Sequence, residues 1–282
     1  MNTTRPSIST FIQARSVGDA AARPAPGRVR TGTARRPGFT LVELLVVIMI
    51  VAMLAALVTV AASRALTAAR NAAIKAEIDM LHMAIMNYKN EYGSFPPCYD
   101  SLTLTGTSVA GKHVARIFPR ATNLSSQFTT LLNSKTPAYV VPTNAIPFWL
   151  SGYTSDSTSP LSPGNRQKLF DFNLARVDST TGIYFPSGKG GSPYVYIVPG
   201  EYGNAWPPAA FTYSVGGNSY TIAAGAYFAQ PQNGQYTNAP PFANPDTFQI
   251  LCAGRDEVFG NDDDLSNFWP GTRKDYRDSL TQ

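Results

Sequence analysis

Oxygen-bearing side chains crowd a short segment near the end of the chain. Residues 256–267 hold four Asp, one Glu and two Asn, and Gly260 among them allows a sharp turn. Adjacent carboxylates repel one another unless a cation or solvent separates them. Ca²⁺ takes about six to eight oxygen ligands, backbone carbonyls included. The spacing is not that of an EF-hand, so the segment predicts either an irregular calcium-binding loop or a solvated acidic turn.

A single carboxylate interrupts a long apolar run near the other end of the chain. Residues 39–62 contain one charged side chain, that of Glu43. A helix of this length, at about 1.5 Å per residue, spans the roughly 30 Å hydrocarbon core of a bilayer. An acid inside such a segment costs about 2.5–3.5 kcal/mol on insertion scales. The run therefore predicts a transmembrane helix in which Glu43 has a specific role.

The segment before this run is basic and lacks apolar periodicity. Residues 1–38 carry seven Arg and one acid, Asp19, so this leader has a net charge of +6, whereas the whole chain has +5. The positive-inside rule places the leader in the cytoplasm and the bulk of the chain across the membrane. Because the remainder carries −1, we expect no nucleic-acid partner. The apolar run is too long for a secretory signal peptide.

The junction between leader and run resembles a known processing site. Residues 38–45, Gly-Phe-Thr-Leu-Val-Glu-Leu-Leu, follow Arg35 and Arg36, and together they resemble the N-terminus of type IV pilins and type II secretion pseudopilins. The resemblance implies that a prepilin peptidase/methyltransferase cuts after Gly38 and methylates the new amine of Phe39. It also implies a homo-oligomeric filament, minor pseudopilins as partners, and an assembly platform in the bacterial inner membrane.

Glu43 has two compatible roles. Cleavage would leave a cationic amine on Phe39, and charges about 4 Å apart at low effective dielectric attract by several kcal/mol. The Glu43 carboxylate of one subunit is then expected to pair with this amine on a neighbour during assembly. Thr40-x-x-Glu43 also fits a helix capping box.

The helix is predicted to continue well past the membrane. No Gly or Pro lies between Phe39 and Tyr92, and residues 63–93 carry an apolar stripe typical of an amphipathic helix. Its members are Ile74, Ile78, Leu81, Ile85, Tyr88 and Tyr92. Gly93 and the pair Pro96-Pro97 end the helix. Residues 88–97 resemble the same exit in G-type major pseudopilins.

Residues 94–282 are predicted to form a globular β domain. Short β-favouring runs occupy 138–141, 194–198, 210–215, 219–229 and 247–252, with a hairpin turn at 216–218. The expected fold class is α+β: the long transmembrane-to-periplasmic helix packed on one antiparallel sheet with long loops, as in pilins. Segments 101–137 and 142–192 lack strong periodicity and are expected to be surface excursions.

The only cysteines are Cys98 and Cys252. The compartment outside the inner membrane permits a disulfide between them. Spacing alone cannot separate a bridge from two buried thiols, so both alternatives stay open.

The acidic loop, residues 254–269, resembles the calcium-binding loop of G-type pseudopilins. Gly254-Arg-Asp256 and the run from Asp264 to Trp269 fall at matching places. The resemblance implies a Ca²⁺ site with the side chains of Asp256 and Asp264 as its best ligands. Further candidates are the side chains of Asp262 and Ser266 and the backbone carbonyls of Leu251 and Val258.

Three functions compete. The first is a pseudopilin of a type II secretion-like periplasmic filament, anchored by a single pass in the inner membrane. The second is a type IV pilus pilin for adhesion, motility or DNA uptake. The third is a membrane-tethered enzyme or binding domain, which is disfavoured because the chain has two His, no G-x-S-x-G motif and no Walker A spacing at 188–191. We expect no enzymatic activity.

Overall fold

The computed structural model describes residues 38–100, 108–133, 135–202, 211–215, 217–222, 225–227 and 242–280. The chain divides into two compact units, Met1–Leu54 and Ala55–Gln282, and one long helix contributes residues to both. The predicted leader up to Pro37 lies outside the described residues.

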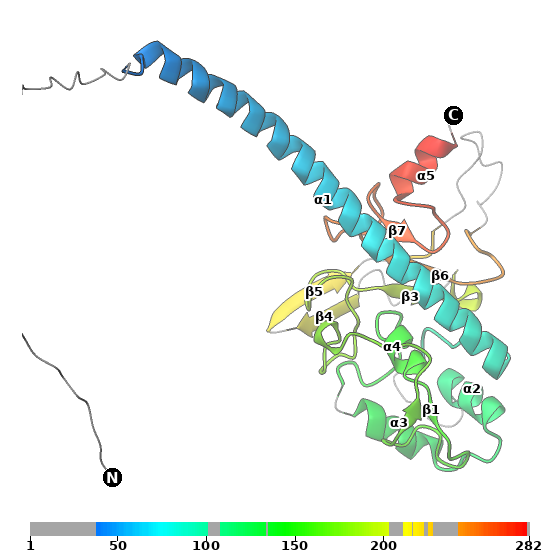
Figure 1. The fold of residues 1–282 in the computed structure, drawn as a ribbon. Helices are drawn as coiled ribbons and strands as arrows, with labels where there is room; N and C mark the ends of the chain where they lie inside the picture. Colours follow the sequence, from blue (N-terminus) through cyan, green and yellow to red (C-terminus); the bar gives the residue numbers. More distant parts are fainter. Residues whose placement is uncertain are drawn as a thin grey trace, which may run out of the picture. The chain divides into compact units, whose positions relative to one another are not determined.

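Helix α1, Leu41–Tyr92, is the element on which the candidate motif is built (Figure 1). Its sequence is rich in Ala, Leu, Met and Ile, which favour helix. It contains no Pro, which would remove a backbone N–H donor, and no Gly, which would weaken the helix. The helix ends where predicted: Gly93 adopts φ +80° and its N–H donates to the Lys89 carbonyl at 2.7 Å. Glycine takes this left-handed conformation without strain.

In the second unit, α1 buries the predicted apolar stripe. Its buried residues are Ile74, Ile78, Leu81, Ala84, Ile85 and Tyr88. They belong to one core that also contains Phe128, Trp149, Tyr196 and Phe248. The amphipathic pattern therefore predicted the packed face of the helix correctly.

The β structure is antiparallel but divided among three small sheets. The central sheet has the order β3 (Val195–Ile197), β6 (Gln249–Cys252), β7 (Leu265–Ser266), and it pairs Tyr196 with Ile250 and Cys252 with Leu265. The predicted hairpin is present as β4 (Phe211–Val215) and β5 (Asn218–Ile222). A third pair joins β1 (Tyr153–Thr154) and β2 (Arg166–Gln167).

Two details of the predicted strands were wrong. Residues 138–141 form no strand, although Val140 and Val141 are buried. The run 219–229 is a strand only as far as Ile222, residues 225–227 have no regular structure, and its other members lie outside the described residues. The α+β class with a long helix on antiparallel sheets is nevertheless confirmed.

The middle of the chain contributes to the core, contrary to the prediction of surface excursions. It holds α2 (Val109–Ile117), α3 (Leu124–Leu132), α4 (Ala145–Leu150) and the short 3₁₀ helix Leu174–Arg176. A second 3₁₀ helix, Pro199–Glu201, and α5, Arg273–Ser279, come later. Helices this short repeat the 3.6-residue period only about twice, so their apolar pattern is weak in the sequence.

Polar contacts also fasten α1 to the domain. Both carboxylate oxygens of Glu77 are used: Oε1 accepts from Arg176 and the Tyr184 hydroxyl, and Oε2 accepts from the Tyr194 hydroxyl. Farther along, the Tyr88 hydroxyl lies 2.8 Å from His113 Nε2 and also bonds the Tyr153 hydroxyl. Neither cluster was predicted. For the Glu77 cluster, the sequence offered one signal: a charged residue, Glu77, next to the apolar stripe members Ile74 and Ile78.

Candidate functional site

The predicted cleavage point lies just before α1. Gly38, Phe39 and Thr40 precede the first helical residue and are exposed, and Phe39 is 74% exposed. No heavy atom of the described residues lies within 4 Å of the position that a Cβ on Gly38 would occupy. Within the described part of the chain, nothing therefore covers the backbone at Gly38.

Glu43 forms the predicted capping box with Thr40. Its Oε2 accepts hydrogen bonds from the Thr40 backbone N–H and hydroxyl, both at 2.9 Å. The Glu43 N–H donates in return to the Thr40 hydroxyl at 3.2 Å. Reciprocal bonds of this kind satisfy N–H groups that the first helical turn leaves without partners. Within the described residues Oε1 makes no hydrogen bond, so one carboxylate oxygen remains for another partner.

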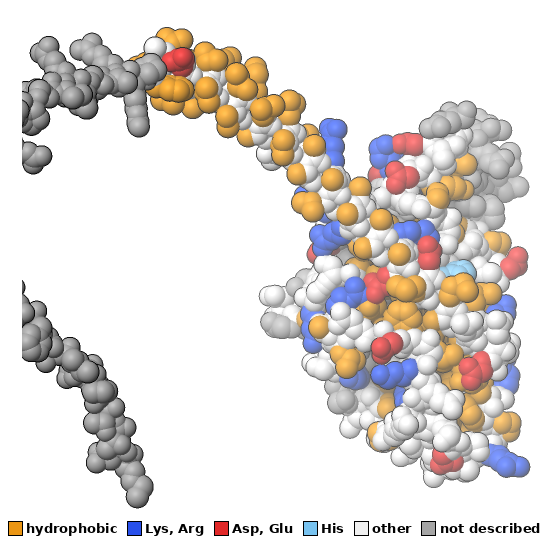
Figure 2. Space-filling model, in the orientation of Figure 1, with side chains coloured by type: hydrophobic (Ala, Val, Ile, Leu, Met, Phe, Trp, Pro, Cys, Tyr) orange, Lys and Arg blue, Asp and Glu red, His pale blue; other side chains and the backbone are white. Residues whose placement is uncertain are grey.

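The apolar segment after the motif is not covered by any other described part of the chain. Residues 41–63 are all exposed, and Figure 2 shows apolar side chains along the visible face of this part of α1. Among the described residues, α1 is the one helix long and apolar enough to cross a membrane, and none of its apolar window is buried. Lipid or other helices must cover a surface of this kind.

Asp264 is the most buried acid of the acidic loop, with 1% exposure. Its Oδ2 accepts from the Gly260 N–H at 2.7 Å, the Asn261 N–H at 3.1 Å and the Tyr227 hydroxyl. Its Oδ1 is buried without a hydrogen-bond partner among the described residues. Burial raises the pKa of this carboxyl group. An unpaired buried oxygen is costly, so Asp264 is the position in the loop where an added ligand would gain most.

The neighbouring acids fold the loop back on itself. Asp263 Oδ2 accepts from the N–H groups of Arg255 and Asp256. Asp256 accepts from the Val258 N–H at 2.9 Å and from the Asn261 side chain. Gly254, with φ +62°, lies so close to this turn that an added Cβ would stand 2.3 Å from the Asp263 carbonyl oxygen. Only glycine fits at that point.

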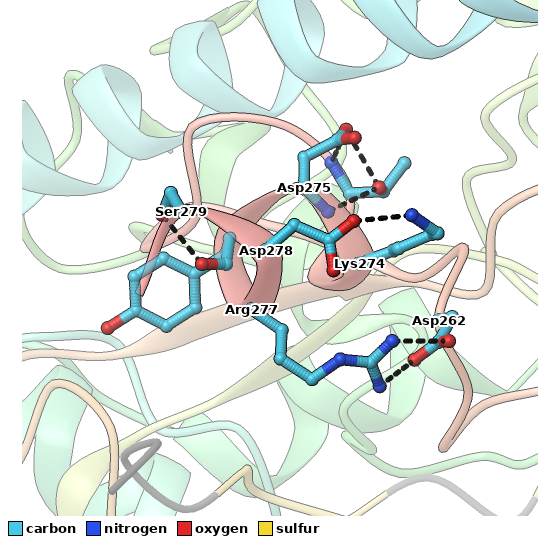
Figure 3. Close-up of polar contacts among 8 residues, drawn as sticks. Asp262, Lys274, Asp275, Arg277, Asp278 and Ser279 are labelled. Atoms are coloured by element: carbon cyan, nitrogen blue, oxygen red, sulfur yellow. Dashed lines mark hydrogen bonds and ion pairs between the residues drawn. The ribbon is translucent and has the colours of Figure 1, made fainter. Parts of the chain in front are cut away.

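Asp262 has a different partner from the one predicted. Its carboxylate is paired by two hydrogen bonds with Arg277 of α5, at 2.6 and 2.8 Å (Figure 3). The guanidinium lowers the pKa of Asp262. A planar fork that meets both carboxylate oxygens leaves this acid poorly available to a metal.

The other predicted ligands are scattered around the loop. Ser266 and Leu251 face each other as paired residues of β7 and β6 and are buried, whereas Val258 is 59% exposed. Within the described part of the chain, no three His, Cys, Asp or Glu side chains converge on one point.

Cys98 and Cys252 are both free and buried. Burial raises the pKa of each thiol to about 12, so both remain protonated at neutral pH. The structure therefore contains the second of the two predicted alternatives, two separate buried thiols.

Comparison with known proteins adds one match. Residues 33–59 match the family model described as the prokaryotic N-terminal methylation motif. No curated protein and no solved structure matches the chain. The matched residues contain Gly38, Phe39 and Glu43 and reach into the apolar part of α1. The matched motif is the one expected at the N-terminus of type IV pilins and pseudopilins, and here it lies at the start of a helix long and apolar enough to cross a membrane.

Proposed function

We propose that this chain is a pseudopilin: a subunit of a type II secretion-like periplasmic filament that supports protein secretion. It is cut after Gly38 and methylated at Phe39 before assembly. One observation carries the proposal. Among the described residues, an exposed Gly38–Phe39 junction precedes a helix whose apolar first part is not covered by other residues. Such a helix fits an element that passes from lipid into contact with other copies of itself.

Deletion of the gene tests which filament the subunit builds. If the chain is a secretion subunit, we expect exported proteins to accumulate in the periplasm of the deletion strain while surface pili remain. A type IV pilus subunit predicts the reverse: loss of surface filaments and of adhesion, motility or DNA uptake, with secretion intact. Expression of the wild-type chain should restore the lost property. A strain with neither defect would contradict both assignments.

We also propose that the acidic loop binds Ca²⁺ through the side chains of Asp264 and Asp256. Ser266 and the carbonyls of Leu251 and Val258 are the remaining candidate ligands. The unpartnered Oδ1 of Asp264 supports this proposal, because hard oxygens are the ligands that Ca²⁺ prefers. Asp262 is left out because Arg277 holds it. Burial disfavours the charged form of the Asp264 carboxylate. A bound ion would offset that charge and would stabilise the folded loop.

Calorimetric titration of the full chain in detergent with CaCl₂ tests this assignment. Asp264→Asn should weaken calcium binding by at least about tenfold, because it removes a charged ligand from the ion. Asp262→Asn is the matched control in the same loop and should bind calcium as the wild type does. Absence of calcium binding, or a loss in Asp262→Asn with none in Asp264→Asn, would overturn the site.

A further inference from the structure

We propose that a pocket beside α3 and α4 binds the carboxylate of a small ligand that has one apolar ring or a short branched chain. The pocket has a volume of about 200 Å³. Its lining residues all belong to the second unit, and none of them is part of the acidic loop. The proposal is independent of the filament assignment.

The walls of the pocket suit a small apolar body. They include Leu132 of α3, Pro147 and Phe148 of α4, and Val177 after the 3₁₀ helix. A cavity of about 150 Å³ is large enough for benzene, whereas drug-sized ligands need about 300–1,000 Å³. The size therefore limits the buried part of the ligand to a single ring or a comparable side chain.

The charge of the lining is entirely positive. Arg166 of β2 and Lys135 are the charged residues among the described residues that line it, and none of these described residues is an acid. In the described part of the chain, neither cation has an ion pair with a carboxylate. Lys135 extends its stem along the wall, since its Cδ lies 3.9 Å from the position of a Cβ on Gly182. Two cations without a counter-ion favour an anion.

The uncharged polar side chains Asn144 and Thr181 of the lining already have hydrogen-bond partners within the chain. Asn144 already accepts from the Val141 N–H at 2.8 Å and donates to the Tyr139 carbonyl at 3.0 Å. The Thr181 hydroxyl donates to Asp178.

The two cations retain donors. Arg166 uses Nη2 on the Leu161 carbonyl and Nε on that of Ser162, so Nη1 is without a bond among the described residues. Lys135 uses one of its three N–H groups on the Ser179 carbonyl. The hydrogen-bond donors that remain free in the lining therefore belong to Arg166 and Lys135. A carboxylate matches them, because it is negatively charged and only accepts hydrogen bonds. Burial lowers the pKa of Arg166, and a bound anion would offset that desolvation.

Fluorine NMR titration of the full chain in detergent with para-fluorobenzoate tests the proposal. We expect saturable binding, and binding of the uncharged para-fluorobenzamide that is at least about tenfold weaker. Arg166→Gln and Lys135→Gln should each weaken benzoate binding, and Val177→Trp should block it by filling the pocket. Lys168→Gln is the matched control, because Lys168 is an exposed cation near Arg166 that pairs with Asp171.

Equal binding of acid and amide would overturn the proposal, as would no saturable binding. So would wild-type affinity in both Arg166→Gln and Lys135→Gln. If Arg166→Gln does not fold, as judged by circular dichroism, Lys135→Gln and Val177→Trp decide. An acetylated dipeptide ending in Phe, compared with its C-terminal amide, identifies the source of the carboxylate. Tighter binding of the dipeptide acid than of benzoate assigns the pocket to chain termini, and binding of benzoate alone assigns it to free small acids.

Discussion

Glu43 caps its helix through one carboxylate oxygen and leaves the other without a partner among the described residues. This geometry allows the two predicted roles to coexist, because the cap occupies Oε2 and an amine on a neighbouring subunit could approach Oε1. Only the second role depends on the negative charge. A neutral amide can still accept a hydrogen bond from Thr40, but it cannot form an ion pair.

Glu43→Gln therefore separates the cap from the charge. We expect Glu43→Gln and Glu43→Ala to be inserted and cut normally, yet both to form few filaments, because each loses the attraction to the Phe39 amine of a neighbour. Filaments can be sheared, pelleted and counted by electron microscopy. Normal filaments from Glu43→Gln with few from Glu43→Ala would show that capping alone matters, and the pairing role would be wrong.

His113 gives the globular domain a pH dependence. Burial and the nearby Arg116 lower its pKa from 6.5 to about 4, and its described polar partner is the Tyr88 hydroxyl. The folded state thus binds this proton less readily than the unfolded state. Stability from His113 is complete above pH 6.5 and falls as the pH drops toward 4, by about 2–3 kcal/mol at pH 4.5.

Urea unfolding of the full chain in detergent, followed by tryptophan fluorescence, measures this effect. Trp149 lies 5.3 Å from the His113 ring, centroid to centroid, and is a suitable reporter. At pH 4.5, the acid-induced loss in the free energy of unfolding should be smaller in His113→Gln than in the wild type by about 2–3 kcal/mol. Equal losses in the two proteins would show that His113 does not titrate as described. Carboxylates that also titrate in this range cancel in the difference.

At the scale of elements, α1 has two parts. Its N-terminal part is apolar and exposed, and its C-terminal part supplies buried side chains to the core of the globular domain. Its apolar stripe was predictable because the pattern repeats over five turns. The short helices α2, α3 and α4 were not, because each repeats the pattern too briefly. The contacts of Glu77 with Arg176, Tyr184 and Tyr194 were also beyond prediction, since they join residues about 100 positions apart in the sequence.

Glu77→Gln tests how strongly these contacts hold α1 to the domain. The side chain of Glu77 is 14% exposed and that of Arg176 is 21% exposed, so removal of the charge leaves a largely buried guanidinium without its partner. We expect a loss of about 2–4 kcal/mol in the free energy of unfolding.

Asp79→Asn is the control on the same helix. It breaks the pair with Lys75, in which Asp79 is 56% exposed, and should cost less than about 0.5 kcal/mol. Similar losses in the two variants would contradict a special role for Glu77.

At the scale of the whole molecule, the two candidate sites, the methylation motif and the acidic loop, differ in how far the sequence predicted them. Gly38, Phe39 and Glu43 form a local motif, so their types and spacing were sufficient, and the match to residues 33–59 agrees with them. The acidic loop depends on contacts distant in the sequence. Arg277 takes Asp262 away from the predicted ligand set, and Tyr227 supports Asp264. Composition cannot show which acid an arginine will hold.

The central claim is that this chain is a prepilin-type precursor. Mass spectrometry of the protein extracted from its native membrane tests this most directly, with Gly38→Val as the matched variant. We predict that the wild-type protein begins at Phe39 and carries one methyl group on that amine, whereas Gly38→Val keeps its leader. A wild-type chain that retains the leader, or a Gly38→Val chain cut at the same bond, would contradict the account.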